Sequence, residues 1–327
     1  MDSAETTLPN GKPGVSILIV AYNSAALIAA CLEAIPAAVS DHSAEVLLVD
    51  NGDGSTESLV AHDFPDVRII PSRGNIGFAA GNNLLAAHAR ADRLLLLNPD
   101  MVAQPGSIDA LMRGAARHPE AVAWGGVTVD RTGRPDAGNA IAMPSLSELV
   151  SVALGRSNIG NAPLKGLDRD MEVDVLIGGF VMFARKAWEE AGGLDERYFL
   201  YCEEVDLFHR LKQKGHSFWR ISDACGQHEA AHGNHLSPMR LLYRAAGSME
   251  FARAHWSPGA RAMSALLIWI AAVERFLAGR LLGSRRPHLR QLGEGYRHVA
   301  MRPHFWMAGY HREHGLMARL ASTPIKP

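Results

Sequence analysis

Four consecutive leucines at residues 94–97 constrain this fold more than any other segment, because they predict a strand buried on both faces, as in a parallel sheet. The run stops at Asn98-Pro99-Asp100, and a proline cannot continue the ladder of a central strand. Ligands of open α/β sheets bind just beyond the carboxyl ends of such strands. A carboxylate there can hold a divalent cation against a phosphorylated ligand, although a turn alone also explains Asn-Pro-Asp.

Strands and helical segments alternate from Val15 to about Asp130, with strands expected at 15–20, 46–49 and 67–70 before the leucine strand. This alternation predicts βαβ units, and therefore an α/β fold with a mainly parallel central sheet flanked by helices. Right-handed crossovers bring the carboxyl ends of parallel strands to one edge. Asp50, the segment 75–83 and Asp100 are therefore expected to converge there.

Composition excludes several classes of protein. The chain has 327 residues, 47% of them hydrophobic, and a net charge of −1, which is typical of a globular protein and argues against a nucleic-acid partner. Its three cysteines are far apart and form no CxxC, so neither a disulfide framework nor a cysteine zinc site is expected. Reduced thiols in the cytoplasm are the simplest interpretation. Residues 1–14 lack the apolar core of a signal peptide, and we expect a disordered lead-in.

The residues at the expected sheet edge are those of a nucleotide site. Asp50 can accept hydrogen bonds from a base or a ribose. Gly77 and Gly81 allow close backbone approach, and a helix that begins near them presents N–H groups to an anion. Neither a Walker loop nor GxGxxG is present. The interpretation that remains is a site for a nucleoside diphosphate that is held through a metal ion.

Three acids, Glu203, Glu204 and Asp206, stand within four positions of an otherwise apolar and aromatic segment. On a helix, Glu203 and Asp206 share one face while Glu204 points elsewhere. Attraction of acids to a helix N-terminus explains the same pattern without any chemistry.

Three histidines follow a strand-like segment, at His228, His232 and His235. Their order does not match that of zinc metalloproteases. One histidine that joins Asp100 on a single cation is the more economical interpretation.

Eight ordered motifs resemble inverting glycosyltransferases of family 2, closest to their rhamnosyltransferase-like branch. They are VAYNS at 20–24, VDN at 49–51, NIGFAAGNN at 75–83, LNPD at 97–100, GG at 178–179, LDERYFLY at 194–201, EEVDL at 203–207, and His228. The resemblance extends from about Val15 to Trp256. It implies a GT-A fold over 15–239, with a nucleotide-sugar-binding half (15–130) and an acceptor-binding half (131–239), followed by a helical extension at 240–327.

The resemblance also implies roles for individual residues. Asp100 and His228 match metal and diphosphate ligands, so a divalent cation, Mg²⁺ or Mn²⁺, is the expected cofactor. The catalytic base falls at the acidic motif; Glu204 aligns best, with Glu203 and Asp206 left open. Residues expected to contact the nucleotide sugar are Ala21, Tyr22, Asn23, Asp50, Asn51, Asn75, Gly77, Gly81, Asn82, Asn98 and Gly179.

Two positions depart from the family pattern. The metal motif often begins with aspartate, whereas Asn98 is an amide, so metal affinity should be modest and depend partly on the diphosphate. The base is usually aspartate, and Glu204 adds a methylene.

The function implied by the resemblance is inverting transfer of a sugar, with dTDP-rhamnose as the first candidate donor. The acceptor would be a glycan or lipid-linked glycan in cell-surface polysaccharide synthesis. UDP-linked galactofuranose, glucose or N-acetylglucosamine stay open, as does a non-catalytic nucleotide-sugar-binding module. A sugar nucleotidyltransferase would need a glycine-rich basic loop after the first strand, where this chain has Ala21-Tyr22-Asn23-Ser24.

The C-terminal region is helical in pattern. Residues 265–273 are strongly apolar but too few for a membrane-spanning helix of about 20 residues, and several arginines follow. A basic amphipathic helix on the cytoplasmic face of a membrane is one hypothesis. A helix packed on the catalytic domain, or a contact with a second copy, explains the pattern equally well.

Overall fold

The computed structural model describes residues 11–72, 74–135, 140–156, 167–228 and 237–323. His232, His235 and residues 1–10 of the expected lead-in lie outside these ranges. The elements up to residue 129 are β1 (Val15–Ala21), α1 (Ile28–Ala38), β2 (Ala44–Asp50), α2 (Ser55–Asp63), β3 (Arg68–Ile69), α3 (Phe78–His88), β4 (Arg93–Leu97), β5 (Met101–Ala103), α4 (Ser107–Arg117) and β6 (Ala121–Val129). Strand and helix therefore alternate here, as predicted.

The next stretch is more irregular and adds antiparallel strands. Its elements are β7 (Ala140–Ile141), α5 (Leu146–Ala153), β8 (Met171–Glu172), β9 (Val175–Leu176), β10 (Phe180–Ala184), α6 (Arg185–Ala191), α7 (Glu203–Gln213) and β11 (Ser217–His228). In the described part of the chain the main sheet has nine strands, eight of them in the order β3-β2-β1-β4-β10-β6-β11-β5, and β8 also pairs with β11. The sheet is parallel from β3 to β4 and mixed beyond it, because β10 runs antiparallel to both of its neighbours.

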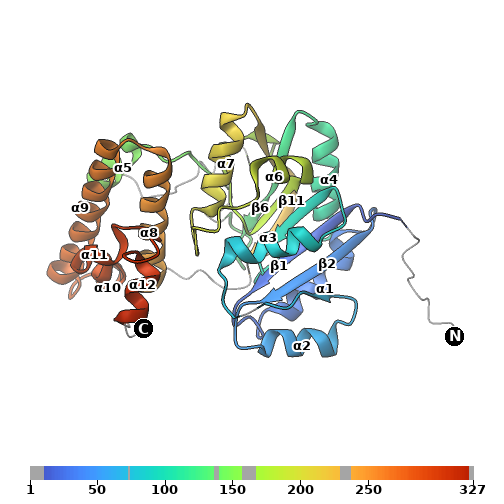
Figure 1. Cartoon of the computed structure of the whole chain (residues 1–327), viewed down its shortest axis with the longest axis horizontal. Helices are drawn as coiled ribbons and strands as arrows, with labels where there is room; N and C mark the ends of the chain where they lie inside the picture. The colour runs from blue at the N-terminus through green and yellow to red at the C-terminus, as the bar shows by residue number, and fades with distance from the viewer. Residues whose placement is uncertain (1–10, 73, 136–139, 157–166, 229–236, 324–327) are drawn as a thin grey trace.

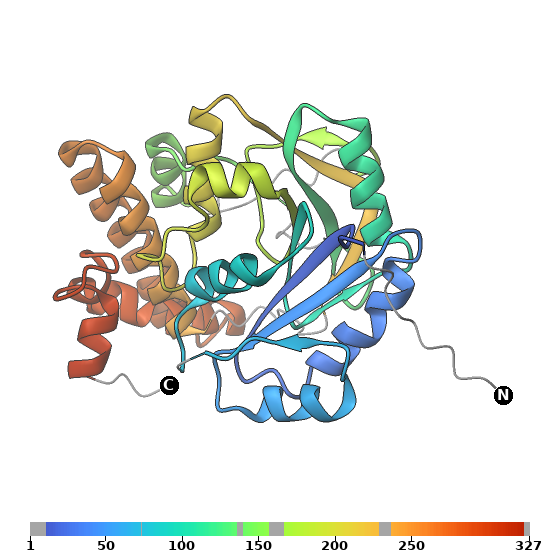
Figure 2. The same ribbon diagram turned by 45° about the vertical axis from the view of Figure 1, so that its right-hand side comes forward.

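Side chains of the central strands alternate between two apolar cores, one on each face of the sheet (Figures 1 and 2). Leu18 and Leu96 pack with α3, α6 and α7 on one face, whereas Ile17 and Leu95 pack with α1 and α4 on the other. The leucine run is thus buried on both faces, because each leucine reaches a helix layer from its own side of β4.

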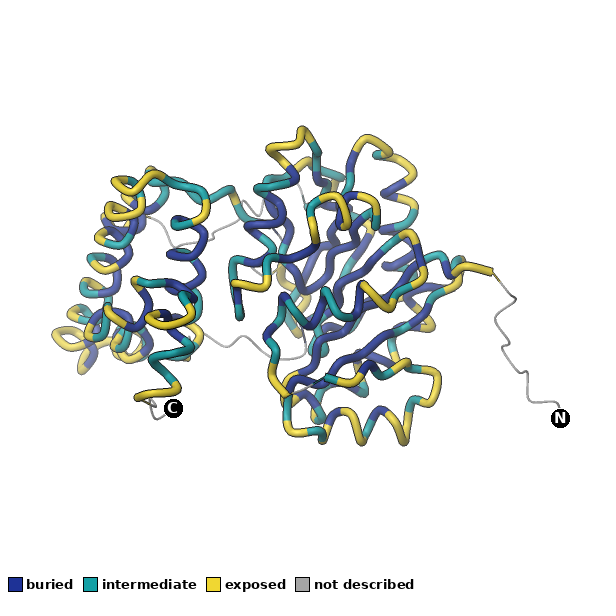
Figure 3. Tube along the Cα trace, in the orientation of Figure 1, coloured by how far each residue is buried: buried dark blue, intermediate teal, exposed yellow. Residues whose placement is uncertain are grey.

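The remaining helices form a separate group beside α7, with α5 among them (Figure 1). They are α8 (Pro238–His255), α9 (Pro258–Leu282), α10 (Pro287–Met301), α11 (Pro303–Trp306) and α12 (Leu316–Ser322). We call α5 and α8–α12 the helical unit. Its buried residues belong to the same core as the face of the sheet that α7 covers. The outer turns of α9 are largely exposed (Figure 3). Within the described ranges, no helix has the length and apolarity needed to span a bilayer.

Candidate active site

The carboxyl ends of β1 and β2 lie side by side and hold the expected nucleoside residues. These parallel strands pair Ala21 with Asp50 at their last positions. A Cβ on Gly52 would lie 2.8 Å from Asn23 Oδ1 and 2.9 Å from Asp50 Oδ1, so glycine is needed where the two loops meet. Asn23 has a positive φ of 51°, which asparagine tolerates better than most residues, and Tyr22 beside it is 59% exposed.

Asp50 shapes the loop that follows its strand. Its Oδ1 accepts from the Gly52 N–H at 2.7 Å, and its Oδ2 accepts from the N–H of Glu57 in the first turn of α2 at 3.1 Å. A carboxylate has about four lone-pair sites, so Asp50 can still accept from a nucleoside.

Asn51 connects this edge to the glycine motif before α3. Its Nδ2 donates to the Gly77 carbonyl at 3.0 Å, while its buried Oδ1 has no hydrogen-bond partner among the described residues. Asn75 Oδ1 accepts from the Gly77 N–H at 3.0 Å and closes a tight turn. A buried acceptor without a partner is uncommon, and its place at the sheet edge suits a ligand donor.

Gly77 lets the segment 194–201 pack against this loop. Its φ is 86°, and a Cβ here would lie 2.8 Å from the carbonyl oxygen of Phe199. That carbonyl accepts the first N–H of α3, from Phe78, at 3.0 Å. The first N–H of α3 is thus used to dock the 194–201 segment, and binding of an anion by the N–H groups that follow it stays a prediction.

Gly81 and Asn82 lie inside α3 and are both buried. A Cβ on Gly81 would lie 3.0 Å from both methyl groups of Val20, and Asn82 Nδ2 donates to the Phe78 carbonyl at 3.0 Å. The structure thus gives both residues a role in seating α3 on the sheet. Contact of Gly81 and Asn82 with the nucleotide sugar stays a prediction.

The predicted diphosphate and metal residues meet at the end of β4. The Asn98 N–H donates to the Gly179 carbonyl at 3.0 Å. A Cβ on Gly179 would lie 3.0 Å from Asn98 Nδ2 and 3.7 Å from His228 Nε2, so glycine lets the Asn98 amide approach the backbone closely, with the His228 imidazole beside it. Asp100 precedes Met101, which pairs with His228 across the β5–β11 ladder.

These residues fit a divalent cation only in part. Among the described residues, no cluster of three or more histidine, cysteine, aspartate or glutamate side chains is arranged as a metal site. Asp100 and His228 provide one carboxylate and one imidazole, so a cation here would need further ligands from a bound diphosphate. This agrees with the modest protein-only affinity expected from the amide at Asn98.

The acid pair Glu203–Glu204 begins α7 in a buried environment. Glu203 is 3% exposed, and one carboxylate oxygen of each residue (Oε2) is buried without a hydrogen-bond partner among the described residues. Burial raises the pKa of both carboxyl groups, and the charge of Glu204 raises that of Glu203 further. The positive charge of Arg244 on α8 opposes the rise in the pKa of Glu204. Of the two, Glu204 is therefore the one that ionises more readily.

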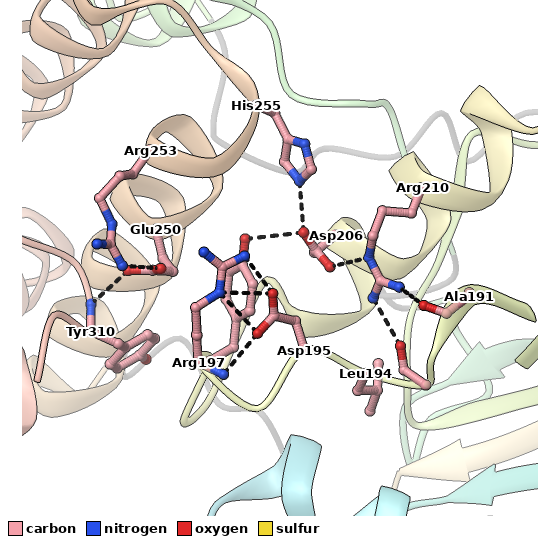
Figure 4. Close-up of polar contacts among 12 residues, drawn as sticks. Ala191, Leu194, Asp195, Arg197, Asp206, Arg210, Glu250, Arg253, His255 and Tyr310 are labelled. Carbon is pink, nitrogen blue, oxygen red and sulfur yellow. Dashed lines mark hydrogen bonds and ion pairs between the residues drawn. The ribbon is translucent and has the colours of Figure 1, made fainter. Parts of the chain in front are cut away.

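Asp206 does not share this environment (Figure 4). Its Oδ2 accepts from Arg210 at 2.7 Å and its Oδ1 lies 2.6 Å from His255 Nε2, while the side chain is 1% exposed. Arg210 also donates to the backbone carbonyls of Ala191 and Gly193. Asp206 is thus a buried ion-pair residue that joins α7 to α8, and its place among the candidate bases stays a prediction.

Helix α8 covers the start of α7. The two residues before Glu203 have positive φ values, 68° for Tyr201 and 71° for Cys202, which is a strained backbone for side chains of this kind. A Cβ on Gly247 of α8 would overlap the Tyr201 carbonyl oxygen. The Tyr310 hydroxyl donates to the Leu200 carbonyl and also lies 3.2 Å from the Tyr243 carbonyl.

Tyr310 is itself fixed by a buried charge. Its N–H donates to Glu250 Oε2 at 3.1 Å, and Glu250, which is fully buried, pairs with Arg253 (Figure 4). Sequence analysis missed Arg244, Gly247, His255 and Tyr310, which lie 37 or more residues after the acidic motif. No local pattern marks them, because only the folding of α8 onto α7 brings them there.

Comparison with known proteins identifies relatives of the chain. The family model described as glycosyl transferase family 2 matches residues 16–192. The N-acetylglucosaminyl-diphospho-decaprenol L-rhamnosyltransferase of Mycobacterium tuberculosis (strain ATCC 25618 / H37Rv) is 30% identical over 229 residues, which is 62% of this chain and 72% of that protein. Rhamnosyltransferase WbbL of Escherichia coli (strain K12) is 25% identical over 228 residues, 67% of this chain and 85% of that protein.

A solved structure supports the architecture. The mannosyltransferase PcManGT from Pyrobaculum calidifontis, in complex with GDP-Man and Mn²⁺, superposes with a TM-score of 0.51 at 17% identity, covering 93% of this chain and 88% of that one. The likeness confirms the predicted GT-A fold.

Proposed function

This chain belongs to glycosyl transferase family 2 and is a glycosyltransferase, and we propose that it transfers rhamnose from dTDP-rhamnose with inversion at the anomeric carbon. The acceptor we propose is a lipid-linked glycan in cell-surface polysaccharide synthesis. Two relatives are named as rhamnosyltransferases, one of them acting on a diphospho-decaprenol, and this supports the choice.

The observation that carries the proposal is the buried acid pair at the start of α7. This pair directly follows the segment 194–201, which packs against the glycine motif at Gly77. Glu204 has a buried oxygen without a partner and the Arg244 charge nearby. In the proposed mechanism, Glu204 removes the proton of the acceptor hydroxyl as that oxygen attacks the anomeric carbon. The bond from this carbon to the diphosphate breaks on the opposite face, so the configuration inverts. The nucleoside diphosphate departs with the electron pair.

The donor is proposed to bind along the carboxyl edge of the sheet. Asp50 and Asn51 would bind the nucleoside, and Asn98 and Gly179 would border the diphosphate. Asp100 and His228 would hold a divalent cation, Mg²⁺ or Mn²⁺, which when bound neutralises charge on the leaving group. PcManGT was solved with a nucleotide sugar and Mn²⁺, which supports a cation in this protein.

We propose a cytoplasmic location for the reaction. All three cysteines are free, and Cys31 is buried. Unpaired thiols are typical of a reducing compartment.

A donor panel tests the proposal. Purified protein is incubated with dTDP-rhamnose and with UDP-linked galactofuranose, glucose and N-acetylglucosamine, each with Mn²⁺ or with chelator, and hydrolysis and binding are measured. Metal-dependent turnover of dTDP-rhamnose alone supports the proposal. Turnover of a UDP-sugar instead would replace the donor, and nucleotide binding without turnover even with acceptor would favour a binding module.

A further inference from the structure

The outer face of α9 is an apolar surface that the other described residues leave uncovered. Helix α9 packs on its neighbours through buried residues such as Leu267, Ile268 and Ala272. On the opposite side, exposed or half-buried apolar residues recur at spacings of three and four, which places them on one helix face. We call this set the α9 stripe: Met263, Leu266, Ile270, Val273, Leu277 and Leu281.

The stripe is too extensive to be ordinary surface. Leu277 is 47% exposed and Leu281 is 75% exposed. Trp269 borders the stripe, and its Nε1 donates to the Ala300 carbonyl at 3.0 Å, which fixes the edge of the indole against α10. Contiguous exposed apolar surface of this kind marks a contact with a partner or a membrane.

Positive charge accompanies the stripe. Residues 258–307 contain eight arginines and two glutamates, whereas the rest of the chain has 25 lysines and arginines against 32 aspartates and glutamates. Arg280 is on α9, while Arg285, Arg286 and Arg290 follow its end, and all four are exposed. Among the described residues of this segment, Arg290 and Glu294 make the one ion pair, at 4.0 Å.

We propose that the α9 stripe and its arginines bind the surface of a bilayer that contains anionic phospholipids. Apolar side chains on one helix face and arginines beside them are the features that hold a helix in the lipid interface. A second copy of the chain fits less well, because pairing two α9 stripes would bring two strongly basic surfaces together.

Docking of α9 on lipid would set the position of the catalytic helix. Helix α8 contacts both α9 and α7, so the start of α7 would lie about two helix layers, roughly 20 Å, from the lipid surface. An acceptor anchored in the same bilayer would then be within reach of a protruding glycan. The membrane contact itself does not depend on which donor or acceptor the enzyme uses.

Vesicle flotation of the full chain tests the proposal. Vesicles of phosphatidylcholine alone are compared with vesicles that also contain phosphatidylglycerol, at low and high salt. We expect flotation with the anionic vesicles that weakens as salt rises. Flotation that is equal on both vesicle types, or absent from both, would overturn the proposal.

Two double variants separate the apolar and the charged contributions. Leu266→Asp/Leu277→Asp places charges in the stripe and should abolish flotation. Arg285→Glu/Arg286→Glu should lower the affinity for anionic vesicles at least 25-fold, at about fivefold for each arginine removed. Wild-type flotation of both variants would refute the proposal that the α9 stripe and its arginines bind the bilayer.

Arg134→Glu/Lys186→Glu is the matched control, because it makes the same charge change at exposed positions outside the helical unit. It should bind vesicles far better than the Arg285 and Arg286 variant. Circular dichroism and hydrolysis of a soluble donor show that each variant is folded, and they also separate failure here from failure of the proposed function. A stable dimer in sedimentation velocity that Leu266→Asp/Leu277→Asp dissociates, together with no flotation, would assign the stripe to self-association instead.

Discussion

At the scale of single residues, the proposed reaction depends on which of two adjacent buried acids, Glu203 and Glu204, is ionised. Both lose hydration on burial, and two adjacent carboxylates cannot both ionise readily there. The charge of Glu204 raises the pKa of Glu203, whereas Arg244 lowers that of Glu204. We therefore expect Glu204 to ionise before Glu203, which suits the proposed role of Glu204 as the base.

Glu204→Gln should reduce sugar transfer by a factor on the order of 10²–10⁴, because glutamine cannot accept the hydroxyl proton. Nucleotide binding should persist, since the nucleoside edge is formed by β1 and β2. Single-turnover transfer and calorimetric titration of the nucleotide measure the two effects. Transfer by Glu204→Gln at the wild-type rate would remove Glu204 as the base.

The same base predicts a pH dependence. Burial raises the pKa of Glu204 above the usual carboxyl value of about 4.3, and the base works only when ionised. We therefore expect kcat/KM to rise with pH through a midpoint above that value. In Glu204→Gln this limb of the profile should be absent.

Glu203→Gln should make the folded protein more stable at neutral pH. Burial, and then the charge of Glu204, raise the pKa of Glu203 well above its unfolded value. The contribution of Glu203 to stability is thus full below about pH 4.3 and is lost as pH rises through the folded pKa. Glutamine cannot ionise and avoids this loss.

Urea unfolding of Glu203→Gln and wild type from acid to neutral pH measures the difference, which should vanish at the acid end. The exposed Glu33→Gln serves as control and should show no such trend. A Glu203→Gln protein less stable than wild type at neutral pH would contradict the assignment.

At the scale of elements, the contact between α7 and α8 positions the acid pair. Backbone strain at Tyr201 and Cys202 persists only when the surroundings hold it. Here Gly247 packs against that backbone, Tyr310 bonds the carbonyl just before it, and Asp206 with His255 ties the two helices together. The helical unit is therefore part of the proposed active site.

Tyr310→Phe tests this element-level role. Loss of the hydroxyl removes the hydrogen bond to the Leu200 carbonyl and the weaker contact with the Tyr243 carbonyl, and should cost about 1–2 kcal/mol of stability. We expect transfer to acceptor to slow while the affinity for nucleotide stays near wild type.

Thermal unfolding, transfer kinetics and nucleotide titration of Tyr310→Phe check both effects. Tyr296→Phe is the control, because the Tyr296 hydroxyl has no hydrogen-bond partner among the described residues. If Tyr310→Phe lost stability but kept wild-type transfer, Tyr310 would be structural only.

At the scale of the whole molecule, the proposed donor site joins parts that are distant in the chain. Residues from β1, β2 and β4 border it together with Gly179 and His228 of the second half. A ligand that contacts both halves binds the folded state alone, so it should stabilise the entire chain.

A saturating nucleoside diphosphate with Mn²⁺, at 100 times its Kd, should raise the free energy of unfolding by about 2.7 kcal/mol. Chelator should remove most of this gain, and Asp100→Ala should remove the part that depends on Mn²⁺. Thermal melts with and without each component measure it, with the exposed Asp66→Ala as control. An unchanged Mn²⁺ response in Asp100→Ala would exclude Asp100 as a ligand.

The sequence by itself determined the elements and the edge of the sheet where the site lies. Periodicity and turn residues locate β1, β2 and β4, because the pattern of apolar side chains along a strand indicates which of its faces are buried. Asp50, Asn98 and Asp100 were found in this way, since strand ends are local features. The eight motifs identified the family and, through it, the GT-A fold.

Only the tertiary structure decided which of the neighbouring residues have which task. Glu203, Glu204 and Asp206 are nearly equivalent in sequence, yet Asp206 pairs with His255, 49 residues later, while the other two have no such partner. Gly81 was expected to allow close backbone approach of a ligand, and in the structure Val20 fills the space beside it. The physical reason is that pKa, hydrogen-bond satisfaction and available space depend on the groups that surround a side chain, and folding brings those groups from distant parts of the chain.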